Sequence, residues 1–471
     1  MTQSLLSASW LQSLFQIYAV ALWLIILYTK SSLAQDATIT DEREKQAFYD
    51  VMGALNHDWD WKTLLPDPCG VNAIKGINCD LEGNTFYFTD LNFGPTYDNT
   101  PACSFNATIH PSIVKFTRLR TLSFYNCFTQ ENRTIPVELG RLGSTLLSLT
   151  FRLNAALIGS IPIELGNLDG LERLVISQNK LQGSIPAELG NLTNLKQLVV
   201  SRNDVGGAIP SQIGSLKNLV VLDLSHNLLS GAIPVDLGSL SSLQMLDVSY
   251  NHLYGAIPDE IGRLGALTLL DLSHNMLRGS LPLSMENLQQ LQQLFLNNNP
   301  LGGRLPDFWS GMRNLVSVDL SDSNYVGFIP ESIGQATKLK YLGLSGNKLT
   351  GSIPSQLGFL LLSEMNLSQN SLSGPIPFSA TFLRRLGSNL KLSNNSGLCY
   401  DPANFNFTLD LNTCPPTSWL GGSVQEMPST SSPNVAPNSN LAVKVYLDWF
   451  GATFSGCLSV IILSERLFLE A

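Results

Sequence analysis

The feature that most constrains this chain is an Ile-Pro or Leu-Pro dipeptide that returns at a nearly constant interval. The dipeptide begins at residues 135, 161, 185, 209, 233, 257, 281, 305, 329, 353 and 376, and eight of the ten intervals are 24 residues. A period of roughly 20 to 50 residues is typical of proteins that stack one small unit many times. The chain is therefore predicted to form one continuous stack of coils rather than the separate compact domains that 471 residues would otherwise suggest.

Around each dipeptide the sequence repeats the pattern LxxLxLSxNxLxGxIPxxLGxL, which is clearest from residue 219 onward. The LxxLxL stretch alternates apolar and polar residues with a period of two, which predicts a short strand with one buried face. Leu222 and Leu224 are predicted to point inward, and Val221, Asp223 and Ser225 outward.

One asparagine per repeat follows the strand. An inward asparagine can satisfy the backbone groups of a buried turn, which would otherwise lack partners. This predicted column consists of Asn179, Asn203, Asn227, Asn251, Asn275, Asn299, Asn347 and Asn370. Ser323 interrupts it, so we expect the turn at residues 322–325 to be the least regular.

The Gly-x-Ile-Pro segment favours an extended convex side rather than a full helix, because proline fixes φ and glycine relaxes the turn before it. With strands about 4.8 Å apart, eleven coils would span about 50 Å along the concave face. The predicted fold is an α/β-type repeat solenoid with a parallel concave β-sheet, a largely non-helical convex side and a cap at each end.

These repeats resemble the plant-specific class of leucine-rich repeats found in receptor kinases and in receptor-like proteins without a kinase. The region before them is similar to the receptor-like proteins grouped with Too Many Mouths and the Piriformospora indica-insensitive proteins. The motifs that carry this similarity are Glu44-Lys45-Gln46-Ala47-Phe48-Tyr49, Trp59-x-Trp61, Pro66-Asp67-Pro68-Cys69, Gly76-Ile77-Asn78-Cys79-Asp80, Cys103-Ser104-x-Asn106-Ala107-Thr108 and Phe124-Tyr125-Asn126-Cys127-Phe128. The resemblance implies a right-handed superhelix and a co-receptor or scaffold role at the cell surface, in development or in the response to microbes.

The ends of the chain carry targeting signals. Residues 1–34 are predicted to be a signal peptide cleaved after Ala34, with a retained signal anchor as the alternative. We expect an N-terminal cap region at 35–118, leucine-rich repeats at 119–398 and a C-terminal cap at 399–414. A Pro/Ser/Asn-rich stalk at 415–440 and a hydrophobic tail at 441–471 follow. The tail leaves a transmembrane anchor, a lipid anchor and a soluble form open.

Six cysteines fall into close pairs at the two edges of the repeat region, which favours an oxidising compartment and disulfide-bearing caps. Six thiols allow 15 connectivities, and the local pairing Cys69–Cys79, Cys103–Cys127 and Cys399–Cys414 is our hypothesis. Cys457 is left over in the tail. Export would make N-x-S/T sequons glycosylation candidates, and these lie at Asn106, Asn132, Asn191, Asn366, Asn394 and Asn406.

Composition and motifs argue against two classes of function, nucleic-acid binding and catalysis. The formal net charge of −9 argues against nucleic-acid binding, which needs a basic face. The sequence has no nucleophile elbow, phosphate loop, zinc signature or kinase motif, so we expect a binding protein without catalysis, metal or cofactor.

Departures from the repeat consensus on the outward strand positions mark the predicted partner-binding surface. An apolar and aromatic strip there is expected to face solvent and to form an interaction patch. Its residues are Val221, Met245, Leu269, Phe295, Tyr250, Tyr341, His226 and His274. We expect a charge at Met245 or Leu269 to abolish partner binding without affecting melting. A second column of outward positions is acidic and consists of Asp223, Asp247, Asp271 and Asp319. Such a column would suit a cation or a basic peptide, but Leu-Asp-Leu-Ser is also a common sequence in repeats of this kind.

The predicted function is therefore that of a receptor-like protein at the outer face of the plasma membrane, or in the cell wall if the tail does not anchor it. Its expected partner is a receptor kinase or another extracellular protein, peptide or glycan, and membrane association is expected through the C-terminal tail. A secreted inhibitor of a microbial hydrolase, or a wall-associated binding protein without signalling, is the alternative.

Overall fold

The structure of the protein is a computed structural model that describes residues 39–70, 74–95, 100–402 and 411–415. The chain divides into two units, residues 1–415 and 416–471. The predicted signal peptide, most of the stalk, the hydrophobic tail, Asn406 and Cys457 lie outside the described residues.

The N-terminal cap consists of β1 (Ile39–Thr40), α2 (Glu42–Leu55), α3 (Trp61–Leu64), β2 (Ile77–Glu82) and β3 (Thr85–Phe93). Asp41 caps α2 by accepting hydrogen bonds from two first-turn backbone N–H groups. Glu44 is buried, and its carboxylate accepts hydrogen bonds from the backbone N–H groups of Phe88 and Thr117 at 3.0 and 2.6 Å. This one side chain therefore ties the helix to the first strands of the stack.

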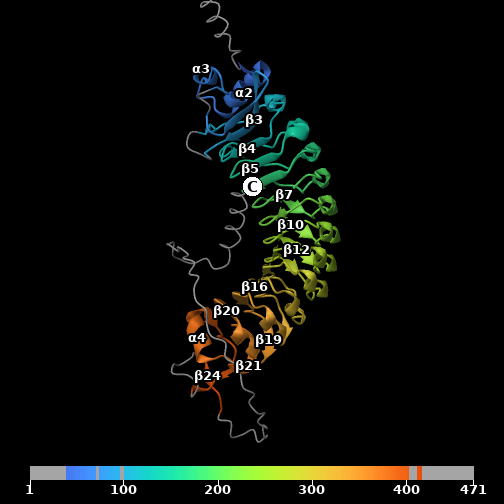
Figure 1. Cartoon of the computed structure of the whole chain (residues 1–471), viewed down its shortest axis with the longest axis vertical. Coiled ribbons are helices and arrows are strands. Elements are labelled where there is room, and N and C mark those ends of the chain that lie inside the picture. The colour runs from blue at the N-terminus through green and yellow to red at the C-terminus, as the bar shows by residue number, and fades with distance from the viewer. Residues whose placement is uncertain (1–38, 71–73, 96–99, 403–410, 416–471) are drawn as a thin grey trace, which may run out of the picture. The chain divides into compact units, whose positions relative to one another are not determined.

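The main sheet runs through the whole repeat region on the inner side of the curved stack (Figure 1). All of its pairings are parallel except that of β2 with β3. Its further strands are β4 (Thr121–Tyr125), β5 (Ser148–Arg152), β6 (Arg173–Ser177), β7 (Gln197–Val199), β9 (Val221–Asp223), β11 (Met245–Asp247), β13 (Leu269–Asp271), β15 (Gln293–Phe295), β16 (Ser317–Asp319), β18 (Tyr341–Gly343), β20 (Glu364–Asn366) and β22 (Leu390–Lys391). Successive coils stay in register, so Val221, Met245 and Leu269 lie side by side.

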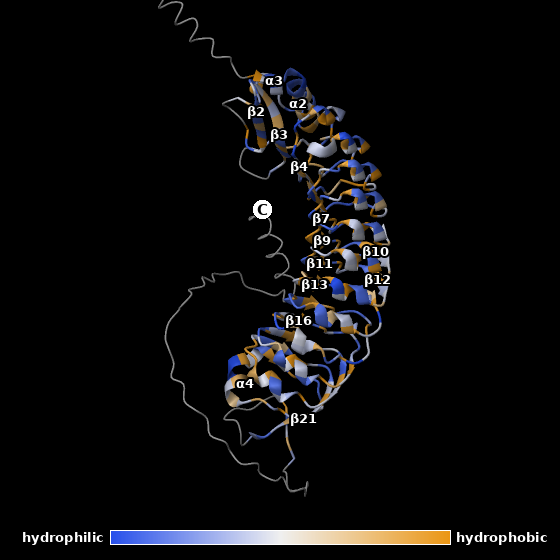
Figure 2. Cartoon of the chain, turned by 45° about the vertical axis from the view of Figure 1, so that its right-hand side comes forward, coloured by the Kyte–Doolittle hydropathy of each residue, from blue (hydrophilic) through white to orange (hydrophobic). Residues whose placement is uncertain are grey.

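Short 3-10 helices cover the convex side, and most begin directly after the repeated proline. They are η1 (Pro111–Lys115), η2 (Val137–Arg141), η3 (Gly143–Thr145), η4 (Ile163–Asn167), η5 (Ala187–Asn191), η6 (Ser211–Ser215), η7 (Val235–Ser239), η8 (Asp259–Arg263), η9 (Leu283–Asn287), η10 (Trp309–Gly311), η11 (Glu331–Gln335), η12 (Ser355–Phe359) and η13 (Gly387–Asn389). The inward leucines and isoleucines form one continuous core, and apolar segments recur in every coil (Figure 2).

The extended segments after the asparagine turns form two further parallel sheets, which we call the lateral sheets. The first contains β8 (Gly206–Gly207), β10 (Leu228–Gly231), β12 (His252–Gly255) and β14 (Met276–Leu277). The second contains β17 (Val326–Gly327), β19 (Lys348–Gly351), β21 (Ser371–Pro375), β23 (Gly397–Tyr400) and β24 (Asn412–Thr413). Helix α4 (Ala380–Leu386) precedes the last coil.

The predicted asparagine column is buried and bridges neighbouring coils. The side-chain nitrogen of Asn251 donates to the carbonyl oxygens of Leu224 and Val248 at 3.0 and 3.1 Å. Its Oδ1 atom accepts the backbone N–H of Leu229 at 2.9 Å. Asn154 and Asn395 make the same kinds of bond and extend the column in both directions. The pattern missed both, because Asn154 lies one residue too far from its dipeptide and no dipeptide follows Asn395.

The turn around Ser323 is irregular, as the sequence predicted. The Ser323 hydroxyl donates to the carbonyl oxygens of Leu296 and Ser321. In the other coils the asparagine Oδ1 also accepts a backbone N–H of the preceding coil, and the shorter serine side chain does not replace that bond. Asp322 and Asn324 both have left-handed φ angles, 52° and 60°, whereas the other turns of the column have one such residue.

The lateral sheet is interrupted one coil earlier, at Pro300. In regular coils the residue after the column asparagine donates its N–H to the preceding coil, as Leu228 does to Val205 at 2.8 Å. Proline has no N–H to donate. The ladder therefore stops after β14 and resumes at β17.

The asparagine column should be a main source of stability. Replacing Asn251 with Ala leaves the Leu229 N–H and three carbonyl groups, those of Leu224, Val248 and Ser249, without this partner, so we expect a loss of about 1–3 kcal/mol in the free energy of unfolding. Replacing the exposed neighbour His252 with Ala is the control and should change little. Denaturant unfolding of both variants is the measurement, and equal stability of the two would contradict a structural role for the column.

Candidate binding surface on the repeat coils

The central part of the predicted strip is covered rather than solvent-facing. Val221, Met245 and Leu269 lie outside the core cluster but are only 8, 5 and 4% exposed. Parallel strands stand about 4.8 Å apart, so large side chains in one column cover each other and the neighbouring acidic column. The expectation that this part of the strip faces solvent is therefore wrong, and a lysine at Met245 or Leu269 is now expected to lower the melting temperature, because it would disrupt packed side chains.

The acidic column is built into the turns that follow it. Oδ1 of Asp247 accepts hydrogen bonds from Ser249 N–H at 2.9 Å and Ser249 Oγ at 2.7 Å. Asp223 and Asp271 bind Ser225 and Ser273 in the same way. These carboxylates therefore stabilise the junction between each strand and its turn. This structural role explains why Asp recurs at the position, and no bound ligand is needed to explain it.

Packing three carboxylates together changes their acidity. Burial, followed by the charges of Asp271 and Asp223, raises the pKa of Asp247 well above its ordinary value. Burial also raises the pKa of Asp271, to about 6. Within the described part of the chain, no group of three or more His, Cys, Asp or Glu side chains is arranged to hold a metal ion.

Three aromatic rings stack at the turn beside this column. The Tyr250 ring lies between the rings of His226 and His274, with centroid distances of 4.2 and 4.0 Å and interplanar angles of 8° and 13°. All three residues occupy the left-handed position before the column asparagine, with φ angles of 52–53°, so the sheet spacing sets the stack. Burial, followed by the charges of Arg202 and His274, lowers the pKa of His226 to about 4. The stack is thus uncharged at neutral pH.

The exposed apolar residues lie next to this stack, on the first lateral sheet. Leu228, Tyr254 and Met276 are 49, 56 and 47% exposed, and Tyr254 pairs directly with Met276. Together with Tyr250, which is 36% exposed, they form what we call the rim patch. The strands β8, β10, β12 and β14 contain no Asp, Glu, Lys or Arg.

Sequence reasoning placed Tyr250, His226 and His274 correctly on one column but missed Leu228, Tyr254 and Met276. Leu228 and Met276 occupy the first position after the column asparagine, where other coils carry Lys180, Asp204 and Lys348. Tyr254 occupies the third position, where the next coil carries the exposed Arg278. Comparing those positions between coils would have revealed them.

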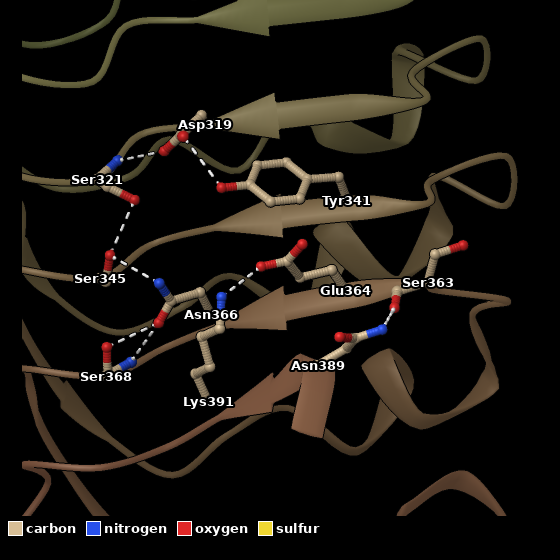
Figure 3. A network of polar contacts seen from close by, with 10 residues as sticks. All are labelled: Asp319, Ser321, Tyr341, Ser345, Ser363, Glu364, Asn366, Ser368, Asn389 and Lys391. Atoms are coloured by element: carbon tan, nitrogen blue, oxygen red, sulfur yellow. Dashed lines mark hydrogen bonds and ion pairs between the residues drawn. The ribbon is translucent and has the colours of Figure 1, made fainter. Parts of the chain in front are cut away.

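The downstream part of the concave face is a polar network (Figure 3). Tyr341 donates its hydroxyl to Asp319 Oδ2 at 3.1 Å, and Lys391 pairs with Glu364 at 2.7 Å. A Cβ atom at Gly343 would lie 2.6 Å from Asp319 Oδ1 and 2.8 Å from the Tyr341 hydroxyl, so a larger residue there would displace this hydrogen-bonded pair. Phe295 and Tyr341 are half-buried. The predicted strip therefore does not form one continuous surface from Val221 to Tyr341.

The caps contain the three expected disulfides, Cys69–Cys79, Cys103–Cys127 and Cys399–Cys414. The sequons differ in their surroundings. Asn132, Asn191 and Asn394 are exposed, whereas Asn106 and Asn366 are half-buried. None of the helices among the described residues is long and apolar enough to cross a bilayer.

The repeats, the concave sheet and the capping disulfides together define a leucine-rich-repeat solenoid. Residues 100–254 match the family described as leucine-rich repeat region, and residues 266–288, 290–312 and 338–360 match the leucine-rich repeat family. The matched stretches are leucine-rich repeats, and the chain is similar over about a third of its length to plant receptor-like proteins.

Two curated relatives come from Arabidopsis thaliana. The chain is 41% identical over 141 residues to Piriformospora indica-insensitive protein 2, a match covering 30% of this chain and 33% of that protein. It is 39% identical over 148 residues to Protein TOO MANY MOUTHS, covering 31% and 29%. The matched segments thus span about a third of the length of these relatives.

A solved structure extends the similarity over more of the fold. The Arabidopsis receptor kinase HAESA, in complex with the peptide hormone IDA and the co-receptor SERK1, is 28% identical with a TM-score of 0.58. The superposition covers 78% of this chain and 65% of that one.

The half-buried sequon at Asn366 should remain unmodified. Its Oδ1 atom accepts hydrogen bonds from the N–H and Oγ of Ser368, and its nitrogen donates to Ser345 Oγ at 3.2 Å. A glycan there would take the place of one hydrogen on this nitrogen and would crowd the half-buried turn on the concave face. Glycopeptide mass spectrometry of the secreted protein should find glycans on the exposed Asn132 and Asn191 but none on Asn366. Full occupancy of Asn366 would show that the turn has another conformation.

The acidic column should make stability depend on pH. Because the folded pKa values are raised, ionising these carboxylates costs folding stability: the cost is greatest above the folded pKa, which is about 6 for Asp271, and it falls below that pH until it is gone below the ordinary value of 3.8. Asp247→Asn should therefore raise the melting temperature near neutral pH, and this advantage should shrink as the pH falls and be lost near pH 4. Asn366, bonded to Ser368 in the same column, shows that asparagine fits the position.

The wild type and Asp247→Asn keep the same histidines, whose lowered pKa values act in the opposite direction below their ordinary value of 6.5. The difference between the two melting curves thus isolates the carboxylate. A difference that does not vary with pH would contradict the raised pKa.

Proposed function

We propose that this protein is a non-enzymatic receptor-like protein of the cell exterior that binds a receptor-kinase ectodomain through the rim patch. The observation that carries the proposal is the exposure of Leu228, Tyr250, Tyr254 and Met276 on neighbouring coils, beside strands without charge. Interface centres are depleted in charge and enriched in tyrosine and methionine. Large exposed apolar patches usually mark interaction sites.

The relatives support a receptor-like role. The HAESA complex contains a peptide hormone and a co-receptor, which shows that a leucine-rich-repeat ectodomain of this kind can bind both. Signalling would pass through the kinase of the partner. A peptide ligand on the concave face would contact Phe295 and the ring stack, since Val221, Met245 and Leu269 are too deeply covered to supply much area.

Location outside the cell follows from the same proposal. Three cystine bridges suit an oxidising compartment. The predicted signal peptide and hydrophobic tail would provide entry to the secretory pathway and attachment to the membrane.

The test is direct binding of the secreted full chain to a panel of receptor-kinase leucine-rich-repeat ectodomains, HAESA included. We expect at least one ectodomain to bind, and Tyr254→Asp to weaken that binding at least about tenfold, because a charge in an interface centre is costly to desolvate. Leu283→Asp is the matched control, since Leu283 is 71% exposed on η9 and lies outside the rim patch.

Both variants must melt like the wild type, because both positions are exposed. Equal loss of binding in the two variants would remove the rim patch as the site. Failure of every ectodomain to bind the wild type would count against the receptor-like role itself.

A further inference from the structure

An exposed phenylalanine and a glycosylation sequon share one tight turn in the N-terminal cap. Ala107 N–H donates to the Ser104 carbonyl at 3.0 Å, which places Phe105 and Asn106 at the two central positions of the turn. Phe105 is 59% exposed. Asn106 begins the sequon Asn106-Ala107-Thr108.

This turn is held firmly from several sides. Ser104 Oγ donates to Asp58 Oδ2 at 2.9 Å, and Asn56 donates its side-chain nitrogen to the Ala102 carbonyl at 3.0 Å. The guanidinium group of Arg133 donates to the carbonyl oxygens of Asn106 and Ala107 at 3.1 and 2.9 Å. The neighbouring Cys103 is bridged to Cys127. The two central side chains are therefore presented in a fixed orientation.

The Asn106 amide is oriented with its oxygen inward. Oδ1 is buried without a hydrogen-bond partner, whereas the amide nitrogen is not buried and forms no hydrogen bond with a described residue. Asn366 differs in both respects, because both ends of its amide are bonded. Asn106 thus directs to solvent the atom that carries an N-linked glycan.

The turn and the loop that binds it carry exposed aromatic rings. The Phe105 ring meets the His57 ring edge to face at 6.2 Å, and the connected loop carries Trp59, which is 54% exposed and stacked on Trp61. Sugar rings have an apolar C–H face that packs on aromatic rings and a rim of hydroxyl groups that stays in water. The exposed Phe105 ring offers such a face for a sugar attached to the next residue.

We propose that Asn106 is N-glycosylated and that the first N-acetylglucosamine of its glycan packs on the Phe105 ring. A bond forms between Asn106 Nδ2 and the anomeric carbon of the sugar, Nδ2 loses one proton, and the bond from that carbon to a lipid-linked diphosphate donor breaks. The inference rests on the export assumed in the proposed function. It assigns the exposed aromatic residues of the cap to the chain's own glycan and leaves partner binding to the coils.

The experiment is a double-mutant cycle on the full chain secreted from plant cells. Four proteins are compared: the wild type, Asn106→Gln, Phe105→Ala and the double variant. Glycopeptide mass spectrometry first establishes occupancy at Asn106. Melting temperature and hydrogen exchange of the loops at residues 55–61 and 103–108 are then measured.

We expect Asn106→Gln to lower the melting temperature by about 2 °C and to speed exchange in both loops. In the Phe105→Ala background the same substitution should have almost no effect, because the ring that receives the sugar is gone. Enzymatic trimming of the wild-type glycan to a single N-acetylglucosamine should preserve the stabilisation. Asn132→Gln is the matched control, since Asn132 is exposed between Glu131 and Arg133, and its effect should not depend on Phe105.

Each outcome has one meaning. An unoccupied Asn106 beside occupied Asn132 and Asn191 would overturn the inference while leaving export intact. An Asn106→Gln effect of equal size in both backgrounds would show a glycan that does not contact Phe105. Absence of glycans at all three sites would contradict export, and with it the extracellular location in the proposed function.

Discussion

The fold depends on a column of buried asparagines that bridge neighbouring coils, interrupted once at Ser323. A coil of 24 residues must turn back sharply inside the protein, and that turn exposes backbone groups to an apolar interior where water cannot reach them. Asn251 satisfies groups on two coils at once, through Leu224 and Leu229 in the preceding coil and Val248 in its own. The buried backbone groups of one coil therefore need the asparagine of the neighbouring coil as a hydrogen-bond partner. This requirement keeps the stack continuous.

This constraint also shapes the surface. The left-handed residue before each asparagine is placed at the same point in every coil, so any side chains there stand in a row at the sheet spacing. Aromatic residues at three such positions stack as a matter of geometry, and His226, Tyr250 and His274 do so. The same repetition lines up Asp223, Asp247 and Asp271, whose pKa values are raised by burial and, at Asp247 and Asp271, further by the neighbouring carboxylates. Repetition thus favours rows of stacked aromatic rings. It disfavours columns of like charge, because neighbouring carboxylates repel each other.

The architecture could be predicted from the sequence because period, strand alternation and buried asparagines are all local signals. The position of the candidate site could be predicted only in part. Alternation correctly set Met245 and Leu269 apart from the core, but it could not show that neighbouring strands cover them, since exposure depends on side chains 24 residues away. The exposed Tyr254 and Met276 lie on a lateral sheet whose pairing is offset by 22 residues, a register absent from the main repeat. Asn366 begins a glycosylation sequon in the sequence. Only the fold shows that its amide oxygen and nitrogen are hydrogen-bonded to Ser368 and Ser345.

The proline at position 300 has a consequence beyond the missing hydrogen bond. In a one-dimensional stack, stability is the sum of the coils and of the junctions between neighbours. Most coils are joined by the main sheet, the core and a lateral sheet, but the junction between β14 and β17 lacks the regular lateral ladder. The adjoining coils also bury Trp309 Nε1 and the Tyr325 hydroxyl without partners. We therefore expect cooperativity between coils to be weakest here, with the rim patch and the N-terminal cap on the same side of the boundary.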